Sequence, residues 1–411
     1  MKTNNTGRLM LGMAVAVIMA SCSARPADDK FVTVFTATNA TAPYFTSGPA
    51  GTVLCWTGVG PEGDMMYYAT YNRQSGTFDA PIAVTPSRGT DANGERMNKV
   101  AFRRDGTVVA VFGRKHPTEK NKYASSILYT QSFDDGATWT EPKFVHSDTL
   151  EDNSRSFFDV AALPDGEVGV AWLDGRHRPG SEGSSLFFAR TLGRDGFQHD
   201  QQVGETVCQC CRTAIRADPQ GHVHIIYRDI EATVNGTVRD FAHIVSSDSG
   251  KTFSVPRMVS NDNWIVDGCP HTGASMSADS DRLEVVWFTA GGRPGLYYSF
   301  SSDGGDTFAS REFISGAARH PQLASKGGQS VIVAEENEQH AAVTGGHEHH
   351  GDNTDASIVI YLRDHDGTVM KDIVDRQGGA FPVVTFIDDE TLLIAYVGEG
   401  DVLVKKVDVT K

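Results

Sequence analysis

Hydrophobic residues in this 411-residue chain occur in short runs that end at turn residues, and the arrangement recurs along the chain. Residues 99–112 (KVAFRRDGTVVAVF) and 159–172 (DVAALPDGEVGVAW) each contain an apolar run, an Asp-Gly turn and a second run rich in valine and aromatic residues. Two β-strands joined by a tight turn are typical of this pattern. Residues 31–411 show no long helical period, so the pattern predicts an all-β domain.

The hairpin is part of a longer unit, in which a third strand leads into a turn motif and a fourth strand leaves it. Four antiparallel strands per unit are typical of a β-propeller blade. First strands are predicted to begin near Pro43, Asn98, Phe158, Arg212, Thr272, Pro321 and Pro382. The sequence therefore predicts seven blades, which we number in chain order. The seventh unit has only three strands before Lys411, and residues 31–37 (FVTVFTA) are predicted to supply the fourth and close the ring.

Three turns share the pattern S-x-D-x-G-x-T-aromatic: residues 132–139 (SFDDGATW), 246–253 (SSDSGKTF) and 301–308 (SSDGGDTF). Their aspartates are Asp134, Asp248 and Asp303. The Ser and Asp side chains can bond the turn backbone, and glycine takes the positive φ. The motif resembles the Asp-box, or BNR repeat, of sialidases. That resemblance implies a sialidase-like β-propeller, and because familiar sialidases have six blades, six is the alternative to seven.

The first residues read as a targeting signal: a basic segment with Lys2 and Arg8, an apolar segment, and small residues before Cys22. This resembles a bacterial lipoprotein signal, with a plain secretory signal as the alternative. It implies a signal peptide over residues 1–21, a lipidated tether over residues 22–30 with the lipid on Cys22, and the propeller over residues 31–411. The expected location is the cell envelope, at the periplasmic face of the outer membrane or the cell surface.

The chain is acidic, with a formal net charge of −15 that becomes −17 when Lys2 and Arg8 are removed. An acidic surface argues against nucleic acid as a partner and against binding to anionic lipid headgroups. Attachment to the membrane is therefore expected to depend on the lipid.

Four cysteines and two histidines are expected on one face of the ring, where first strands begin. Residues 207–213 (VCQCCRT) precede the first strand of blade four, and residues 267–273 (DGCPHTG) precede that of blade five. The metal ligands predicted on this face are Cys208, Cys210, Cys211, Cys269, His271 and His320, for a thiophilic ion such as copper or zinc. Disulfides between the two blades and a redox-active thiol pair are the alternatives.

A histidine-rich segment is expected on the same face, in the loop between the second and third strands of blade six. Its histidines are His340, His347, His349 and His350. They are predicted to form a secondary metal site, and a solvated loop without a ligand is the alternative.

Residues 94–117 resemble the N-terminal Arg-Ile-Pro region of exo-α-sialidases, which implies that Arg96 stands where those enzymes hold the substrate carboxylate. Candidate partners with a catalytic or substrate-binding role are Arg212, Arg228 and Arg319. The sequence departs from that family because Met97 and Asn98 replace Ile-Pro, and because residues 113–125 contain no aspartate to act as acid or base.

Together these features predict a membrane-anchored, extracytoplasmic propeller with a Cys/His metal-binding or redox site for a copper-like ion. The alternative is an exo-α-sialidase-like hydrolase or a glycan-binding module. The C-x-C-C-x-T pattern around Cys208 also resembles a group of sialidase-like lipoproteins. The expected partners are a metal ion or a small anionic or glycan ligand, and whether the protein turns over a substrate is left open.

Overall fold

The computed structural model describes residues 30–176, 182–279, 282–337, 356–364 and 366–409. These residues form strands and two short 3₁₀ helices, η1 (Thr85–Ser87) and η2 (Gly193–Asp195). None of the described helices is long and apolar enough to cross a bilayer. The described residues from Phe31 onward form one compact unit, which is the β-propeller.

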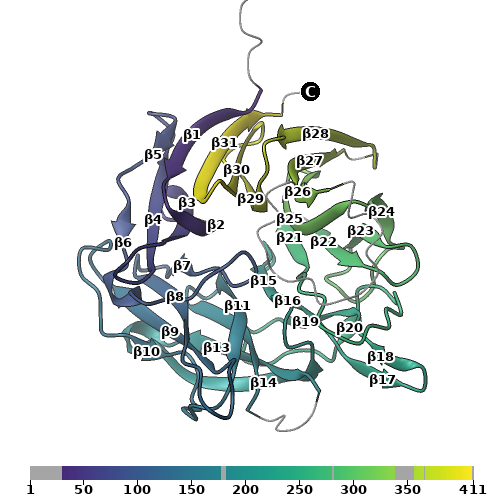
Figure 1. Cartoon of the computed structure of the whole chain (residues 1–411), viewed down its shortest axis with the longest axis horizontal. Coiled ribbons are helices and arrows are strands. Elements are labelled where there is room, and N and C mark those ends of the chain that lie inside the picture. The colour runs from purple at the N-terminus through teal and green to yellow at the C-terminus, as the bar shows by residue number, and fades with distance from the viewer. Residues whose placement is uncertain (1–29, 177–181, 280–281, 338–355, 365, 410–411) are drawn as a thin grey trace, which may run out of the picture. The chain divides into compact units, whose positions relative to one another are not determined.

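Seven antiparallel sheets make up the blades in the described part of the chain (Figure 1). Blades one to three contain β2 (Ala40–Gly48), β3 (Gly51–Gly58), β4 (Met65–Asn72), β5 (Thr77–Phe78) and β6 (Ile82–Ala83); β7 (Lys99–Phe102), β8 (Val108–Lys115), β9 (Ser125–Ser132) and β10 (Lys143–Phe144); β11 (Arg155–Ala162), β12 (Val168–Asp174), β13 (Ser184–Thr191) and β14 (Phe197–Val207). Blades four and five contain β15 (Ala214–Ala217), β16 (Val223–Arg228), β19 (Phe241–Ser246) and β20 (Arg257–Met258); β21 (Ser275–Asp279), β22 (Arg282–Thr289), β23 (Gly295–Ser301) and β24 (Glu312–Ser315). Blades six and seven contain β25 (Ala318–Lys326), β26 (Gln329–Glu336), β27 (Ser357–Arg363) and β28 (Val369–Asp375); β29 (Ala380–Phe386), β30 (Thr391–Gly398), β31 (Asp401–Asp408) and β1 (Val32–Ala37).

The first strand of each blade lies at the centre of the ring, since β2, β7, β11, β15, β21, β25 and β29 contact one another in sequence and β29 contacts β2 again. A separate hairpin, β17 (Glu231–Thr233) and β18 (Gly236–Val238), extends from blade four. The predicted all-β propeller with seven blades is confirmed, with four strands in each described blade except blade one, where β5 and β6 both pair with β4. Each apolar cluster packs between neighbouring blades, as where Trp172 of β12 packs among residues of β8 and β9.

The N-terminal strand completes the last blade. β1 pairs antiparallel with β31, from Val32 opposite Lys406 to Ala37 opposite Val402. Phe35 of β1 also contacts the rings of Trp56 and Phe78, so the strand packs against blade one as well.

The Asp-box turns have the geometry that their sequence predicts. Asp134 Oδ1 accepts a hydrogen bond from the Thr138 amide at 2.8 Å, and Ser132 Oγ accepts one from the Gly136 amide at 2.8 Å. The same bonds recur around Asp248 and Asp303. A Cβ on Gly136 would lie 2.4 Å from the hydroxyl of Tyr68 in β4, so the turn packs closely against the preceding blade.

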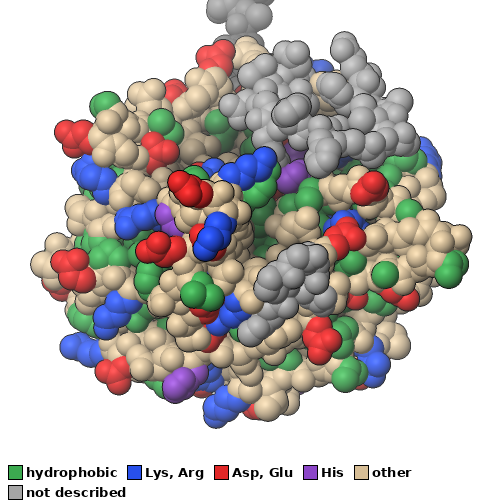
Figure 2. Space-filling view, turned by 60° about the horizontal axis from the view of Figure 1, so that its bottom comes forward, with side chains coloured by type: hydrophobic (Ala, Val, Ile, Leu, Met, Phe, Trp, Pro, Cys, Tyr) green, Lys and Arg blue, Asp and Glu red, His purple; other side chains and the backbone are tan. Residues whose placement is uncertain are grey.

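Positive and negative side chains are mixed on the face of the protein that Figure 2 shows. Figure 2 shows acidic and basic side chains interspersed over the visible face, with no broad patch of one sign. The net negative charge of the chain therefore does not mark a docking surface on that face.

Candidate functional site

The centre of the ring is closed by a buried ionic cluster, Lys99, Asp159, Arg216 and Tyr44, which comes from four successive blades. Lys99 Nζ lies 2.9 Å from Asp159 Oδ1, and Arg216 Nη1 lies 3.0 Å from Asp159 Oδ2. The Tyr44 hydroxyl donates to Asp159 Oδ1 at 3.1 Å. The cavity that these side chains help to line has room for about one water molecule.

Charge sets the protonation of this cluster. Burial alone would raise the pKa of Asp159, but the charges of Lys99 and Arg216 outweigh it and bring the pKa to about 2. Burial also lowers the pKa of Lys99, against the opposing effect of Asp159. The carboxylate of Asp159 thus compensates two cations inside the ring.

The entry to the ring has an unusual backbone. Four inner strands contain a bulge at their start, and each bulge holds a non-glycine residue at positive φ: Ala42, Phe157, His320 and Phe381, with φ between 47 and 54°. Such conformations cost free energy and concentrate at functional sites. These four positive-φ residues indicate a candidate ligand site at the mouth of the ring, where the inner strands begin.

We call the group Arg96, Phe157, His320 and Phe381 the mouth site. His320 Nδ1 lies 3.0 Å from Glu335 Oε2, and the imidazole packs on the ring of Phe381 with centroids 4.6 Å apart. Arg96 lies over the ring of Phe157 at 6.0 Å and pairs with Asp91. The side chains of Arg96 and His320 are 18% and 20% exposed, so both can reach a ligand.

The loop before β7 holds the mouth site together. Gly94 lies against Phe381, since a Cβ on this glycine would lie 1.7 Å from the ring. Glu95 is buried, pairs with Arg212, and accepts a hydrogen bond from the Gly273 amide at 3.1 Å. This loop of blade two thereby contacts blades four, five and seven.

The protonation of His320 depends on its acidic neighbours. Burial alone would lower the pKa of His320, but the charge and hydrogen bond of Glu335, with a further contribution from Glu95, raise the pKa above its usual value. The imidazole therefore carries positive charge over a wider pH range than an exposed histidine.

The four candidate arginines differ in what their side chains contact. Arg96 belongs to the mouth site, and Arg212 Nη2 donates to the Pro321 carbonyl at 2.8 Å while its other end pairs with Glu95. Arg228 is buried and donates to the carbonyls of Arg239, Thr272 and Phe288. Arg319 lies over the ring of Phe288 at 3.7 Å. Arg228 is 2% exposed, so a ligand on the surface of the ring does not reach its guanidinium group.

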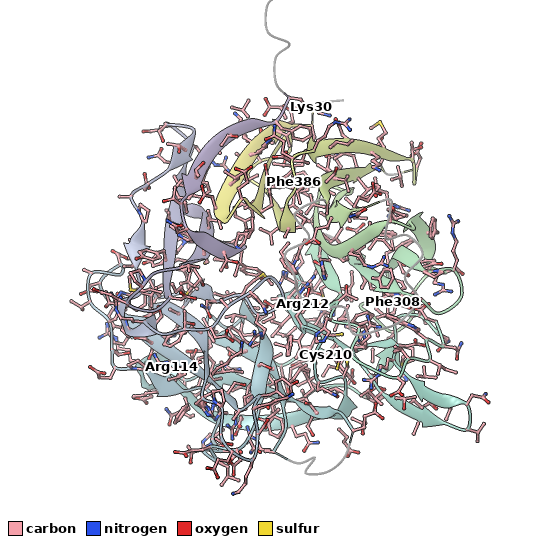
Figure 3. All side chains as sticks on the ribbon, in the orientation of Figure 1. Lys30, Arg114, Cys210, Arg212, Phe308 and Phe386 are labelled. Carbon is pink, nitrogen blue, oxygen red and sulfur yellow. The ribbon has the colours of Figure 1, made fainter. Side chains whose placement is uncertain are left out.

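The cysteines of blades four and five meet, as their strand entries predict. Cys208 Sγ lies 3.4 Å from Cys210 Sγ and 3.8 Å from Cys211 Sγ. Ligand atoms of Cys210, Cys269 and His271 also lie within 4.8 Å of one another. Figure 3 places Arg212 toward the centre of the ring and Cys210 further out. All four thiols are unbridged, and Cys55, the remaining described cysteine, is buried in β3.

Hydrogen bonds from Cys210 and Cys211 hold the pKa of the Cys208 thiol well below its usual value. Burial raises the pKa of Cys210. Arg239 Nη1 lies 3.5 Å from Cys208 Sγ and supplies a positive charge beside it.

Of the other predicted ligands, the structure describes only His320. His320 is placed with Glu335 in the mouth site and does not belong to the group formed by Cys210, Cys269 and His271. Cys22 and the four histidines of the predicted secondary metal site, His340, His347, His349 and His350, lie outside the described residues.

Sequence reasoning missed Glu95, Glu335, Phe157 and Phe381. Glu335 stands near the end of β26, and second strands end on the face where first strands begin, so its position was a usable signal. The aromatic residues gave no signal, because an apolar residue at the start of a strand reads as core.

Comparisons with known proteins agree on the fold. Residues 62–263 match the family model of the BNR repeat-like domain. No curated protein matches the sequence of the chain. An ulvan lyase of polysaccharide lyase family PL25, bound to -[GlcA(1-4)Rha3S]-, is similar with a TM-score of 0.57 and 11% identity, over 92% of this chain and 96% of that chain.

Two further solved structures are similar at comparable identity. The polysaccharide lyase Uly1 has a TM-score of 0.56 and 12% identity, over 96% of each chain. The Hadza microbial sialidase Hz136 has a TM-score of 0.50 and 14% identity, over 85% of this chain and 74% of that chain. At these identities the likeness concerns the fold alone.

Proposed function

Because this chain is a sialidase-like β-propeller with BNR repeats, we propose that it is a glycan-binding protein that holds an acidic saccharide at the mouth site. The observation that carries the proposal is His320: a partly exposed imidazole, held at positive φ between the carboxylate of Glu335 and the ring of Phe381. Similar propellers include lyases and a sialidase, and the glycan bound to one lyase contains GlcA and Rha3S units.

The mouth site offers both kinds of contact that an acidic sugar requires. Phe157 and Phe381 are half-buried and present apolar ring surface to the sugar. Arg96 and protonated His320 supply positive charge for a carboxylate or sulfate. This arrangement favours the glycan alternative over the metal or redox site as the main function.

The mouth site differs from a sialidase centre. Arg212 and Arg228 are 4% and 2% exposed, so neither guanidinium group is as accessible to a ligand as that of Arg96. The structure contains Tyr–Glu pairs, such as Tyr361 with Glu336, but Glu336 follows Glu335 in β26 and points to the opposite face of that strand. We therefore propose that the mouth site recognises an acidic saccharide without the three-arginine cluster that sialidases use.

Replacing His320 is expected to weaken binding selectively. His320→Gln should raise the Kd for a uronic-acid or sulfated oligosaccharide by roughly 10–100-fold, because a charge-assisted contact contributes about 1.5–3 kcal/mol. Binding by the native protein should weaken as pH rises through the pKa of His320, which lies above its usual value. Isothermal titration calorimetry with acidic and matched neutral oligosaccharides measures both effects.

His199→Gln is the matched control, because His199 is exposed on the outer strand β14 and should leave the Kd unchanged. Equal affinity for acidic and neutral oligosaccharides, or native affinity in His320→Gln, would contradict the proposal.

We also propose that the protein is anchored to the cell envelope through a lipid on Cys22. The support is the run of basic, apolar and small residues before Cys22 in the sequence. Cys22→Ala should shift the protein from the membrane fraction to an unacylated precursor or a soluble form, measured by fractionation and metabolic labelling with a fatty acid. Thr3→Ala, in the basic segment, should keep both the label and the location. Unchanged acylation in Cys22→Ala would refute the anchor.

A further inference from the structure

The cysteine cluster lies where three blades meet. Val207 ends β14 of blade three, and the chain then crosses to β15 of blade four through Cys208, Cys210 and Cys211. The Cys208 amide donates to the Arg228 carbonyl at 2.8 Å, which fixes this crossing against β16. Cys269 and His271 come from the crossing between blades four and five. The cluster thus joins two successive crossings of the ring.

The spacing of the sulfurs fits a metal ion. In a tetrahedral site with metal–sulfur bonds of about 2.3 Å, two sulfurs lie roughly 3.8 Å apart. The sulfurs of Cys208 and Cys211 are 3.8 Å apart, and those of Cys208 and Cys210 are 3.4 Å apart. Cys210 belongs to both groups of potential ligands, so the four sulfurs are connected through it.

The surroundings suit an anionic metal–thiolate group. Arg239 Nη1 reaches Cys208 Sγ while its Nη2 pairs with Glu182, and Arg228, whose carbonyl accepts from the Cys208 amide, is buried. These two cations can offset the negative charge that remains when several thiolates bind one ion. Cys208, Cys210 and Cys211 are 1–3% exposed, whereas Cys269 and His271 are half-buried and provide a route of entry.

We propose that Cys208, Cys210, Cys211 and Cys269, with His271 at the edge, bind one thiophilic ion, Cu(I) or Zn(II). Soft thiolate ligands select these ions over Mg²⁺ and Ca²⁺. Each ligating thiol releases its proton to solvent when the ion binds. Apart from Phe157, which belongs to the mouth site and also packs against the cysteines, the two sites share no residue. The metal proposal does not depend on whether the protein binds glycans.

The test uses the full chain, reduced and freed of metal under anaerobic conditions. Titration with Cu(I) against a chromophoric Cu(I) chelator, and separately with Zn(II) against a competing zinc chelator, should show about one ion bound per chain for at least one of them. X-ray absorption should show metal–sulfur distances of about 2.3 Å. Because an ion that binds only the folded state stabilises it, the melting temperature should rise on loading.

Variants separate this site from adventitious binding. Cys210→Ser removes the shared ligand and should weaken binding by at least about 100-fold, given that even outer partners of a metal site contribute 10–100-fold. Cys269→Ser should also weaken metal binding. Because Cys269 is more exposed than Cys210, this change should disturb the fold less than Cys210→Ser does. Cys55→Ala, far from the cluster in β3, should bind as the native protein does.

Three results would overturn the proposal. The first is that neither ion binds the reduced protein. The second is coordination by nitrogen and oxygen alone, or native affinity in both cysteine-to-serine variants. The third is that thiol titration finds these cysteines bridged in the isolated protein and the reduced form binds no ion, which would assign them to disulfides between blades.

Discussion

Asp159→Asn should destabilise the propeller by about 3–5 kcal/mol, the loss typical of removing one partner from a buried ion pair. The substitution keeps the shape of the side chain but leaves the Lys99 ammonium, which is 1% exposed, without its carboxylate. The neutral amide oxygen of the new side chain, the Phe158 carbonyl at 3.0 Å, and the rings of Tyr44 and Phe158 at 4.5 and 5.6 Å would remain near the cation, and none of them carries the compensating charge. Urea unfolding at neutral pH, followed by tryptophan fluorescence, measures the loss.

A matched surface change should have little effect. Asp389→Asn removes an exposed partner of Lys326 and should change the free energy of unfolding by no more than about 0.5 kcal/mol. The double variant Lys99→Met with Asp159→Asn should be less destabilised than the sum of the single changes, because the unpaired charge is then gone. A loss below about 1 kcal/mol in Asp159→Asn would show that the cluster does not hold the centre of the ring together.

The pH dependence has a definite sign. The pKa of Asp159 in the folded protein is about 2, below its ordinary value of 3.8, so the stability that Asp159 contributes is present above pH 4 and is lost as pH falls through 2. The difference in stability between the native protein and Asp159→Asn should therefore shrink over that acid range.

The blades could be predicted because their signals are local. The alternation of apolar and polar residues in segments such as 99–112, often with Asp-Gly at the turn, marked all seven inner strands. The meeting of Cys210 with Cys269 followed from topology alone, since the entries of neighbouring blades share one face.

The mouth site and the central cluster could not be predicted in the same way. The polar residues Lys99 and Asp159 lie in strands whose sequence pattern does not indicate that they are buried. Closure of the ring brings them into contact with each other and with Arg216, which comes from a different blade. The positive φ of His320 and Phe381 has no signal in the sequence, because glycine is the residue that normally marks such a position. Charge pairs between distant residues and strained backbone positions therefore could be identified only from the structure.

Removal of the N-terminal strand should be the most damaging change of all. A variant that begins at Thr38 loses β1 and leaves the edge of β31 unpaired, whereas a variant that begins at Lys30 keeps the strand and is the control. Phe31, which is 6% exposed, and Phe35 would be lost from the packing beside blades seven and one. Burial of one such side chain contributes about 1.5–3 kcal/mol, a large share of the roughly 5–15 kcal/mol that stabilises an ordinary domain.

The shortened protein is expected to aggregate or to melt far below the control, because an unpaired edge next to exposed apolar surface favours association between chains. A synthetic peptide of residues 31–37, added during refolding, should restore a soluble fold by supplying the missing strand to β31. Peptide with the same composition in scrambled order should not, since the register places Val32 opposite Lys406 and Ala37 opposite Val402. If the shortened chain melts with the control in differential scanning calorimetry, β1 is dispensable and closure of the ring depends on contacts between inner strands instead.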